Sequence, residues 1–107
     1  MVKLLIAALS VLLASATPVL AQKSGRVDAG YKLAQAACAE CHGIEADDRI
    51  SPHMDVPSFY DVANKPAMTA IALSVWFRTP HPTMPNFVIR QDETSDLTAY
   101  ILSLKSQ

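Results

Sequence analysis

Two cysteines and a histidine lie close together in the first half of the chain, at Cys38, Cys41 and His42. Cysteines at i and i+3 with a histidine directly after them are the attachment signature of a c-type haem. On one tight turn, this spacing holds two thiols about as far apart as the two vinyl-bearing edges of a porphyrin, and it brings the histidine to the iron from the same side. We therefore expect one covalent haem c, joined by thioether bonds to both cysteines, with His42 as the proximal iron ligand.

A second axial ligand would have to come from elsewhere in the chain, and the candidates are Met54, Met68, Met84, His53 and His81. Met84 is favoured because Pro82 and Pro85 stiffen the loop around it. A thioether ligand raises the reduction potential and, with both axial positions filled, keeps substrates from the iron. His81 is the main competing ligand and would lower the potential. The alternative without a ligand role is that Met84 only fills a gap in the core.

Four further residues are candidates for contacts around such a haem. The second ring nitrogen of His42 needs a hydrogen-bond partner, usually a carbonyl. A proline carbonyl on a rigid backbone is well suited, and Pro52 and Pro57 both qualify. Trp76 and Tyr100 carry polar groups that could reach a haem propionate or a backbone carbonyl, although plain packing explains either residue as well.

The first 21 residues have the pattern of a secretory signal. Lys3 supplies a positive charge, residues 4–16 are an apolar run, and residues 17–21 supply a breaker, Pro18, and small residues at the positions that a signal peptidase reads. We expect cleavage after Ala21, export to the periplasm and a mature domain over residues 22–107. A retained membrane anchor is the alternative, but the apolar part is short for a bilayer span.

The composition fits one small domain and excludes some functions. Loss of Lys3 leaves eight basic residues against ten acidic ones, and the remaining lysines are scattered, which gives no sign of nucleic-acid binding. Cys38 and Cys41 are the only cysteines, so no disulfide framework is available. A domain of this size often needs an additional stabilising group, and a covalently held macrocycle would supply one.

The elements that must position the haem are predicted to be helices joined by loops. Asp28 is expected to cap a helix over residues 29–39, in which Gly30 marks a close approach of another backbone. Gly43 suits the turn after it. Residues 44–58, with two prolines and several charges, read as a loop.

The second half of the chain is predicted to contain three helical segments. Residues 59–62 form a short turn over the haem. Pro66 begins a helix to about Arg78, which is apolar nearly all round and is therefore expected to be buried against the ring. Asp92 caps a last helix over residues 93–105, whose apolar stripe is Leu97, Tyr100, Ile101 and Leu104. With no strand pattern, the fold class is all-α.

The chain resembles the small class I cytochrome c family of bacteria. The residues that carry the resemblance are GYKLAQAACAECH at 30–42, MPNF at 84–87 and DLTAYILSLK at 96–105. The resemblance implies three to four helices around a covalent haem, with the terminal helices crossing at Gly30 and Tyr100 packed there. It also implies Met84 as the distal ligand, and it favours Pro57 over Pro52 as the partner of His42.

The function expected from these residues and from the resemblance is that of a monohaem electron carrier, not an enzyme. One electron would pass through an exposed haem edge to or from a periplasmic or membrane partner, which could be a dehydrogenase, an oxidase or a reductase. The chain lacks the lysine-rich face of the mitochondrial carriers, so their mode of docking is not implied.

Three alternatives remain from the sequence. The first is a haem enzyme subunit or a gas sensor with a displaceable distal ligand. The second is a thiol–disulfide oxidoreductase that uses Cys38 and Cys41, although the βαβ pattern usual for that class is missing. The third is a metal site formed by Cys38, Cys41 and His42 with one further ligand.

Overall fold

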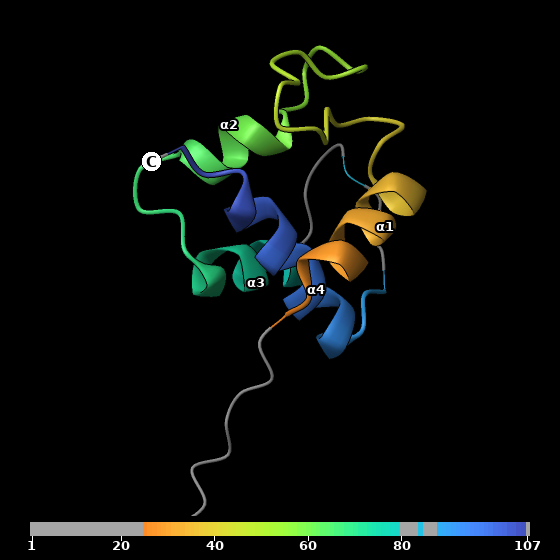
Figure 1. Ribbon diagram of the computed structural model, residues 1–107, viewed down its shortest axis with the longest axis vertical. Coiled ribbons are helices and arrows are strands. Elements are labelled where there is room, and N and C mark those ends of the chain that lie inside the picture. The colour runs from red at the N-terminus through yellow and green to blue at the C-terminus, as the bar shows by residue number, and fades with distance from the viewer. Residues whose placement is uncertain (1–24, 80–83, 85–87, 107) are drawn as a thin grey trace, which may run out of the picture.

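Four helices make up the regular structure of the computed structural model, which describes residues 25–79, 84 and 88–106. They are α1 (Val27–Ala37), α2 (Phe59–Asn64), α3 (Ala70–Arg78) and α4 (Gln91–Ser103), and both α2 and α3 pack against α4 (Figure 1). The described residues contain no strand, which confirms the all-α prediction. They also contain no helix that is long and apolar enough to cross a membrane. The predicted signal segment and His81 lie outside the described residues.

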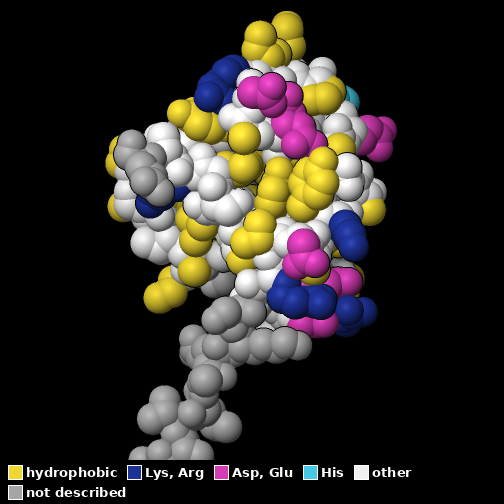
Figure 2. Space-filling view, in the orientation of Figure 1, with side chains coloured by type: hydrophobic (Ala, Val, Ile, Leu, Met, Phe, Trp, Pro, Cys, Tyr) yellow, Lys and Arg dark blue, Asp and Glu magenta, His cyan; other side chains and the backbone are white. Residues whose placement is uncertain are grey.

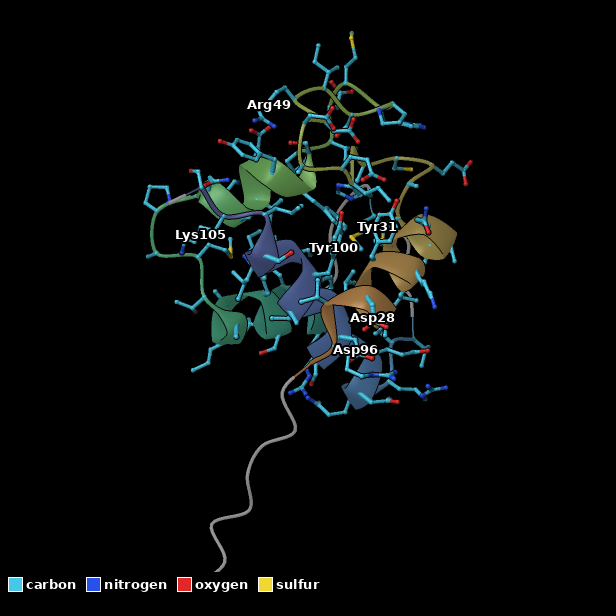
Figure 3. All side chains as sticks on the ribbon, in the orientation of Figure 1. Asp28, Tyr31, Arg49, Asp96, Tyr100 and Lys105 are labelled. Carbon is cyan, nitrogen blue, oxygen red and sulfur yellow. The ribbon has the colours of Figure 1, made fainter. Side chains whose placement is uncertain are left out.

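Helices α1 and α4 cross in direct contact because Gly30 has no side chain. A Cβ atom added at Gly30 would lie 2.0 Å from the carbonyl oxygen of Asp96 and 2.8 Å from Cβ of Tyr100. Beside this point the rings of Tyr31 and Tyr100 pack together, with 5.2 Å between their centroids (Figure 3). The predicted crossing of the terminal helices at Gly30, with Tyr100 packed there, is confirmed.

Helix α1 begins differently from the prediction that Asp28 caps it. Arg26 is the N-cap residue and Asp28 lies in the first turn. The cap comes from the other end of the chain, because the Arg26 backbone N–H donates to Oδ1 of Asp96 at 2.7 Å. The Arg26 guanidinium also lies 3.5 Å from the same carboxylate. The helix ends at Ala37, two residues earlier than predicted, with Cys38 as its C-cap.

The segment between α1 and α2 is a loop, as predicted. The backbone of Gly43 forms hydrogen bonds to the middle of this loop and to the first residue of α2. The Gly43 N–H donates to Oγ of Ser51 at 3.0 Å, and its carbonyl oxygen accepts from the Phe59 N–H at 2.8 Å. Gly43 lies in the turn after the motif, as predicted, and it does not have a positive φ. Its small size matters instead, since a Cβ atom there would lie 2.8 Å from Cβ of Asp48.

The predicted start of α3 at Pro66 is wrong by four residues. Ala67 has a φ of 60°, which lies in the left-handed region and cannot continue a right-handed helix from Pro66. Thr69 is the N-cap, and its Oγ1 accepts from the Ala72 N–H at 3.1 Å. The hydroxyl cap therefore fixes the first turn at Ala70, after the interruption.

The prediction that α3 is buried all round is also wrong. Only Leu73 is buried along this helix, whereas Ile71 and Val75 are 77% and 57% exposed. The reason is that α3 packs one face against α4 and turns the other face away from the fold (Figure 1).

Helix α4 carries the predicted buried stripe, and it begins and ends two residues earlier than predicted. Leu97, Tyr100 and Ile101 are buried and Leu104 is half-buried. The prediction that Asp92 caps this helix is wrong. Arg90 is the N-cap residue and Asp92 lies in the first turn. The Arg90 backbone N–H donates to Oε2 of Glu93 at 3.0 Å. A side chain of the first turn thus satisfies the amide before the helix.

Candidate functional site

The CxxCH motif forms a tight turn directly after α1. The Cys38 carbonyl oxygen accepts hydrogen bonds from the backbone N–H groups of Cys41 and His42, at 3.1 and 2.9 Å. Cys38 is buried and Cys41 is half-buried. The turn therefore fixes the backbone of the three residues that the sequence singled out.

The two cysteines are free thiols, and burial sets the acidity of the first. Desolvation, with a smaller contribution from Cys41, raises the pKa of the Cys38 thiol to about 11. Redox-active CxxC pairs have the opposite property, a cysteine whose pKa is lowered well below its ordinary value. Among the described residues, no group of three or more His, Cys, Asp and Glu side chains is arranged to hold a metal ion. Neither the thiol oxidoreductase nor the simple metal site gains support.

His42 is oriented by one hydrogen bond and one ring contact. Its Nδ1 lies 2.7 Å from the carbonyl oxygen of Pro57, and its ring centroid lies 5.3 Å from that of Phe59. A carbonyl oxygen only accepts, so Nδ1 carries the hydrogen and Nε2 keeps a lone pair for a metal. The hydrogen bond that the resemblance implied is thus present at Pro57, while Pro52 lies exposed in the loop.

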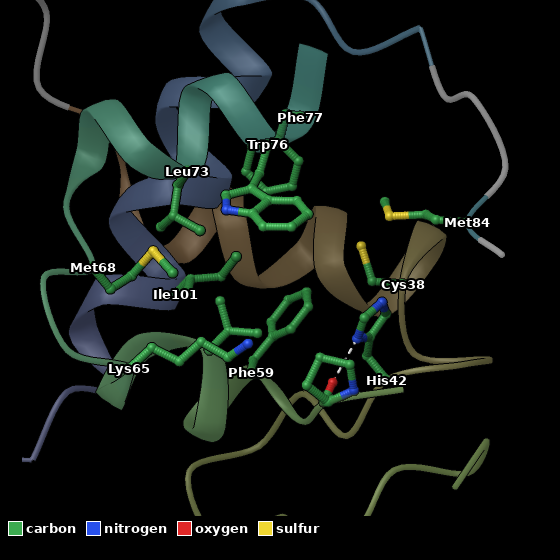
Figure 4. Close-up of a pocket in the computed structure, with 12 residues that line it drawn as sticks. Cys38, His42, Phe59, Lys65, Met68, Leu73, Trp76, Phe77, Met84 and Ile101 are labelled. Carbon is green, nitrogen blue, oxygen red and sulfur yellow. Dashed lines mark hydrogen bonds between the residues drawn. The ribbon is translucent and has the colours of Figure 1, made fainter. Parts of the chain in front are cut away.

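A pocket opens beside the motif and is lined almost entirely by apolar side chains (Figure 4). Its space is about 710 Å³ including the open mouth. A second hollow of about 570 Å³, measured in the same way, shares Cys38, Phe77 and Met84 with it. The apolar walls and the donor set of two thiols, an imidazole and a thioether fit a haem.

Five of the six predicted site residues line this pocket: Cys38, His42, Pro57, Trp76 and Met84. In Figure 4, Cys38, His42 and Met84 lie at one side of the pocket, and Met68 lies at the other. Cys41, the sixth, does not line the pocket but belongs to the same turn. Met54 is 89% exposed in the loop, which places it outside the pocket.

Tyr100, a candidate for a haem contact, belongs to the helix crossing instead. Its hydroxyl donates to the carbonyl oxygen of Ile44 at 2.6 Å, in a buried position. Burial and, to a smaller extent, the nearby Glu45 raise the pKa of Tyr100 to about 12. This hydrogen bond ties α4 to the loop that follows the motif.

Sequence reasoning missed Lys65 as a residue of the pocket. Lysine is expected in solvent, and nothing in its local pattern marked it. Lys65 is the C-cap of α2, and this position brings it to the pocket wall next to Val62 and Met68. Only the fold could have pointed to it.

Comparisons with known proteins concern the chain as a whole. The model of the family described as cytochrome c matches residues 27–105. A cytochrome c-552 of Bradyrhizobium diazoefficiens is 40% identical over 80 residues, covering 73% of this chain and 76% of that protein. A cytochrome c-553-like protein of Synechocystis is 37% identical over 80 residues, covering 75% of this chain and 70% of that protein. No solved structure matches the chain.

Proposed function

The chain belongs to the cytochrome c family, whose members carry a covalent haem c, and we propose that it is a monohaem carrier of single electrons. The observation that supports this function best is the gathering of Cys38, His42 and Met84 at one side of an apolar pocket. When bound, the haem supplies a one-electron Fe(III)/Fe(II) couple. Cys38 and Cys41 would hold it through thioether bonds.

The proposed roles of the remaining residues follow from their chemistry. Pro57 fixes the tautomer of His42, which leaves Nε2 available to the iron, and the Met84 thioether would be the second protein ligand. Two protein ligands would leave no coordination site for a substrate or a gas, which favours a carrier over an enzyme. Phe59 and Trp76 would cover the faces of the ring and exclude water.

We also propose that the carrier works in the periplasm with protein partners. Bacterial cytochromes c of this kind are generally exported, and residues 1–21 have the composition of a signal. A dehydrogenase, an oxidase or a reductase would dock briefly through a small contact. On the face in Figure 2, Lys and Arg side chains stand beside Asp and Glu side chains, so this face would attract a charged partner only weakly.

The test is an absorption spectrum of the purified protein in both redox states, followed by addition of carbon monoxide to the reduced form. We expect a red protein whose haem resists extraction with acidified acetone, a weak near-infrared band of sulfur ligation when oxidised, and no rapid binding of carbon monoxide. Rapid, tight binding would refute the carrier and favour the gas sensor or the enzyme. A colourless protein would refute every haem function.

A further inference from the structure

Among the described residues that line the pocket, Lys65 is the only lysine or arginine. Its backbone is fixed at the end of α2, where its N–H donates to Val62 at 3.3 Å and its carbonyl oxygen accepts from the Met68 N–H at 3.1 Å. Its ammonium group has no hydrogen-bond or ion-pair partner among the described residues. The described residues that line this pocket include no Asp or Glu. They therefore offer one positive charge that none of them neutralises.

The other lysine near this wall is already engaged. The ammonium group of Lys105 donates to the carbonyl oxygen of Met68 at 3.1 Å. Lys65 is also exposed, so its charge lies at the mouth of the pocket and carries little cost of desolvation.

The position of Lys65 matches the chemistry of the haem edge that faces away from the motif. In a haem, the two propionates leave the ring at the edge opposite the vinyl groups. Cys38 and Cys41 hold the vinyl edge, and in Figure 4 Lys65 lies across the pocket from Cys38 and His42. Carboxylates entering an apolar pocket are costly unless they are paired or reach water. An exposed ammonium group at the mouth satisfies both conditions.

We propose that Lys65 pairs with a haem propionate and raises the reduction potential of the iron, an inference that rests on the proposed function. The oxidised haem carries one more positive charge than the reduced haem. A nearby ammonium group therefore disfavours the oxidised state by Coulomb repulsion. Lys65 is a positioning residue and not a ligand of the iron.

The test uses the full-length holoprotein with Lys65→Gln and Lys65→Met, which remove the charge, and Lys65→Arg, which keeps it. The matched control is Lys32→Gln, which removes the same charge from the exposed face of α1. Reduction potentials are measured by spectroelectrochemistry at pH 7 and low salt. Redox-difference infrared spectra report the carboxylate bands of the propionates.

We expect both neutral variants to lower the equilibrium constant of haem reduction by about two- to tenfold, where tenfold is about 59 mV for one electron. Their propionate bands should shift, whereas Lys65→Arg and Lys32→Gln should stay close to wild type. The pairing would be overturned if the two neutral Lys65 variants had the same reduction potential as Lys32→Gln and propionate bands unchanged from wild type. Failure of the proposed function is distinguishable, because the wild-type protein would then lack the spectrum of a covalent, sulfur-ligated haem.

Discussion

Replacement of Gly30 by alanine tests the account of the helix crossing most directly. The added Cβ atom would lie 2.0 Å from the carbonyl oxygen of Asp96 and 2.6 Å from its carbonyl carbon, where ordinary contact begins near 3.4 Å. Both atoms belong to the backbone of α4, so no side-chain rotation relieves the overlap. Helix α1 would have to move away from α4 by more than an ångström, and the packing of Tyr31 against Tyr100 at the crossing would be lost.

The expected cost follows from two opposing effects. Alanine is favoured over glycine inside a helix by about 1 kcal/mol. Forced overpacking in a close-packed interior costs about 1–3 kcal/mol, and more where backbone atoms collide. The strain at Gly30 involves backbone atoms, so we expect a net loss of about 2–4 kcal/mol in the free energy of unfolding. For a domain of this size such a loss lowers the melting temperature by about 10 °C or more.

The assay is guanidinium unfolding of the holoprotein followed by far-ultraviolet circular dichroism. Lys32→Ala is the control, because it lies on the exposed face of the same helix and should change the stability by less than about 0.5 kcal/mol. A Gly30→Ala protein that unfolds at the same denaturant concentration as the Lys32→Ala protein would refute the close contact between α1 and α4.

Three further predictions follow from the site and the crossing. Met84→Ala should lower the reduction potential and let carbon monoxide bind, as measured by redox titration and stopped flow; an unchanged potential would place the ligand elsewhere. Replacing Cys38 and Cys41 together by alanine should leave a largely unfolded chain, because haem binding stabilises the fold, and a cooperative melting transition would contradict this. Tyr100→Phe should cost about 1–3 kcal/mol in denaturant by leaving the buried Ile44 carbonyl unpaired. The raised pKa of Tyr100 also stabilises the fold below about pH 10, and this contribution is lost as the pH rises to about 12, so the phenylalanine variant should lose less stability over that range.

The number and order of the helices and the first residue of α2, Phe59, could be predicted from the sequence, but the first residues of α1, α3 and α4 could not. The reasons differ from one helix to the next. Asp96, from α4, caps the start of α1, and Thr69 caps α3 only because Ala67 interrupts the chain before it. The burial of α3 was overestimated because apolar composition does not tell which faces find a neighbour.

Some residues of the candidate site could likewise be predicted from the sequence, and others could not. Cys38, Cys41 and His42 are adjacent in sequence, so their local spacing was enough to place them together. The hydrogen bond from His42 to Pro57 spans 15 positions and was expected only from the family resemblance, since the residues alone left Pro52 open. Lys65 gave no signal, because its role depends on where the end of α2 meets the pocket.

The contact between Arg26 and Asp96 also limits the order in which the molecule can assemble. Arg26 and Asp96 are 70 positions apart, so their contact cannot form until the chain has been made as far as Asp96. Long-range contacts of this kind form slowly, because a large loop must close first. Cys38 belongs to the same buried cluster as Leu97 of α4. We therefore expect the Cys38 thiol to be more accessible to haem before α4 packs against α1 than after it.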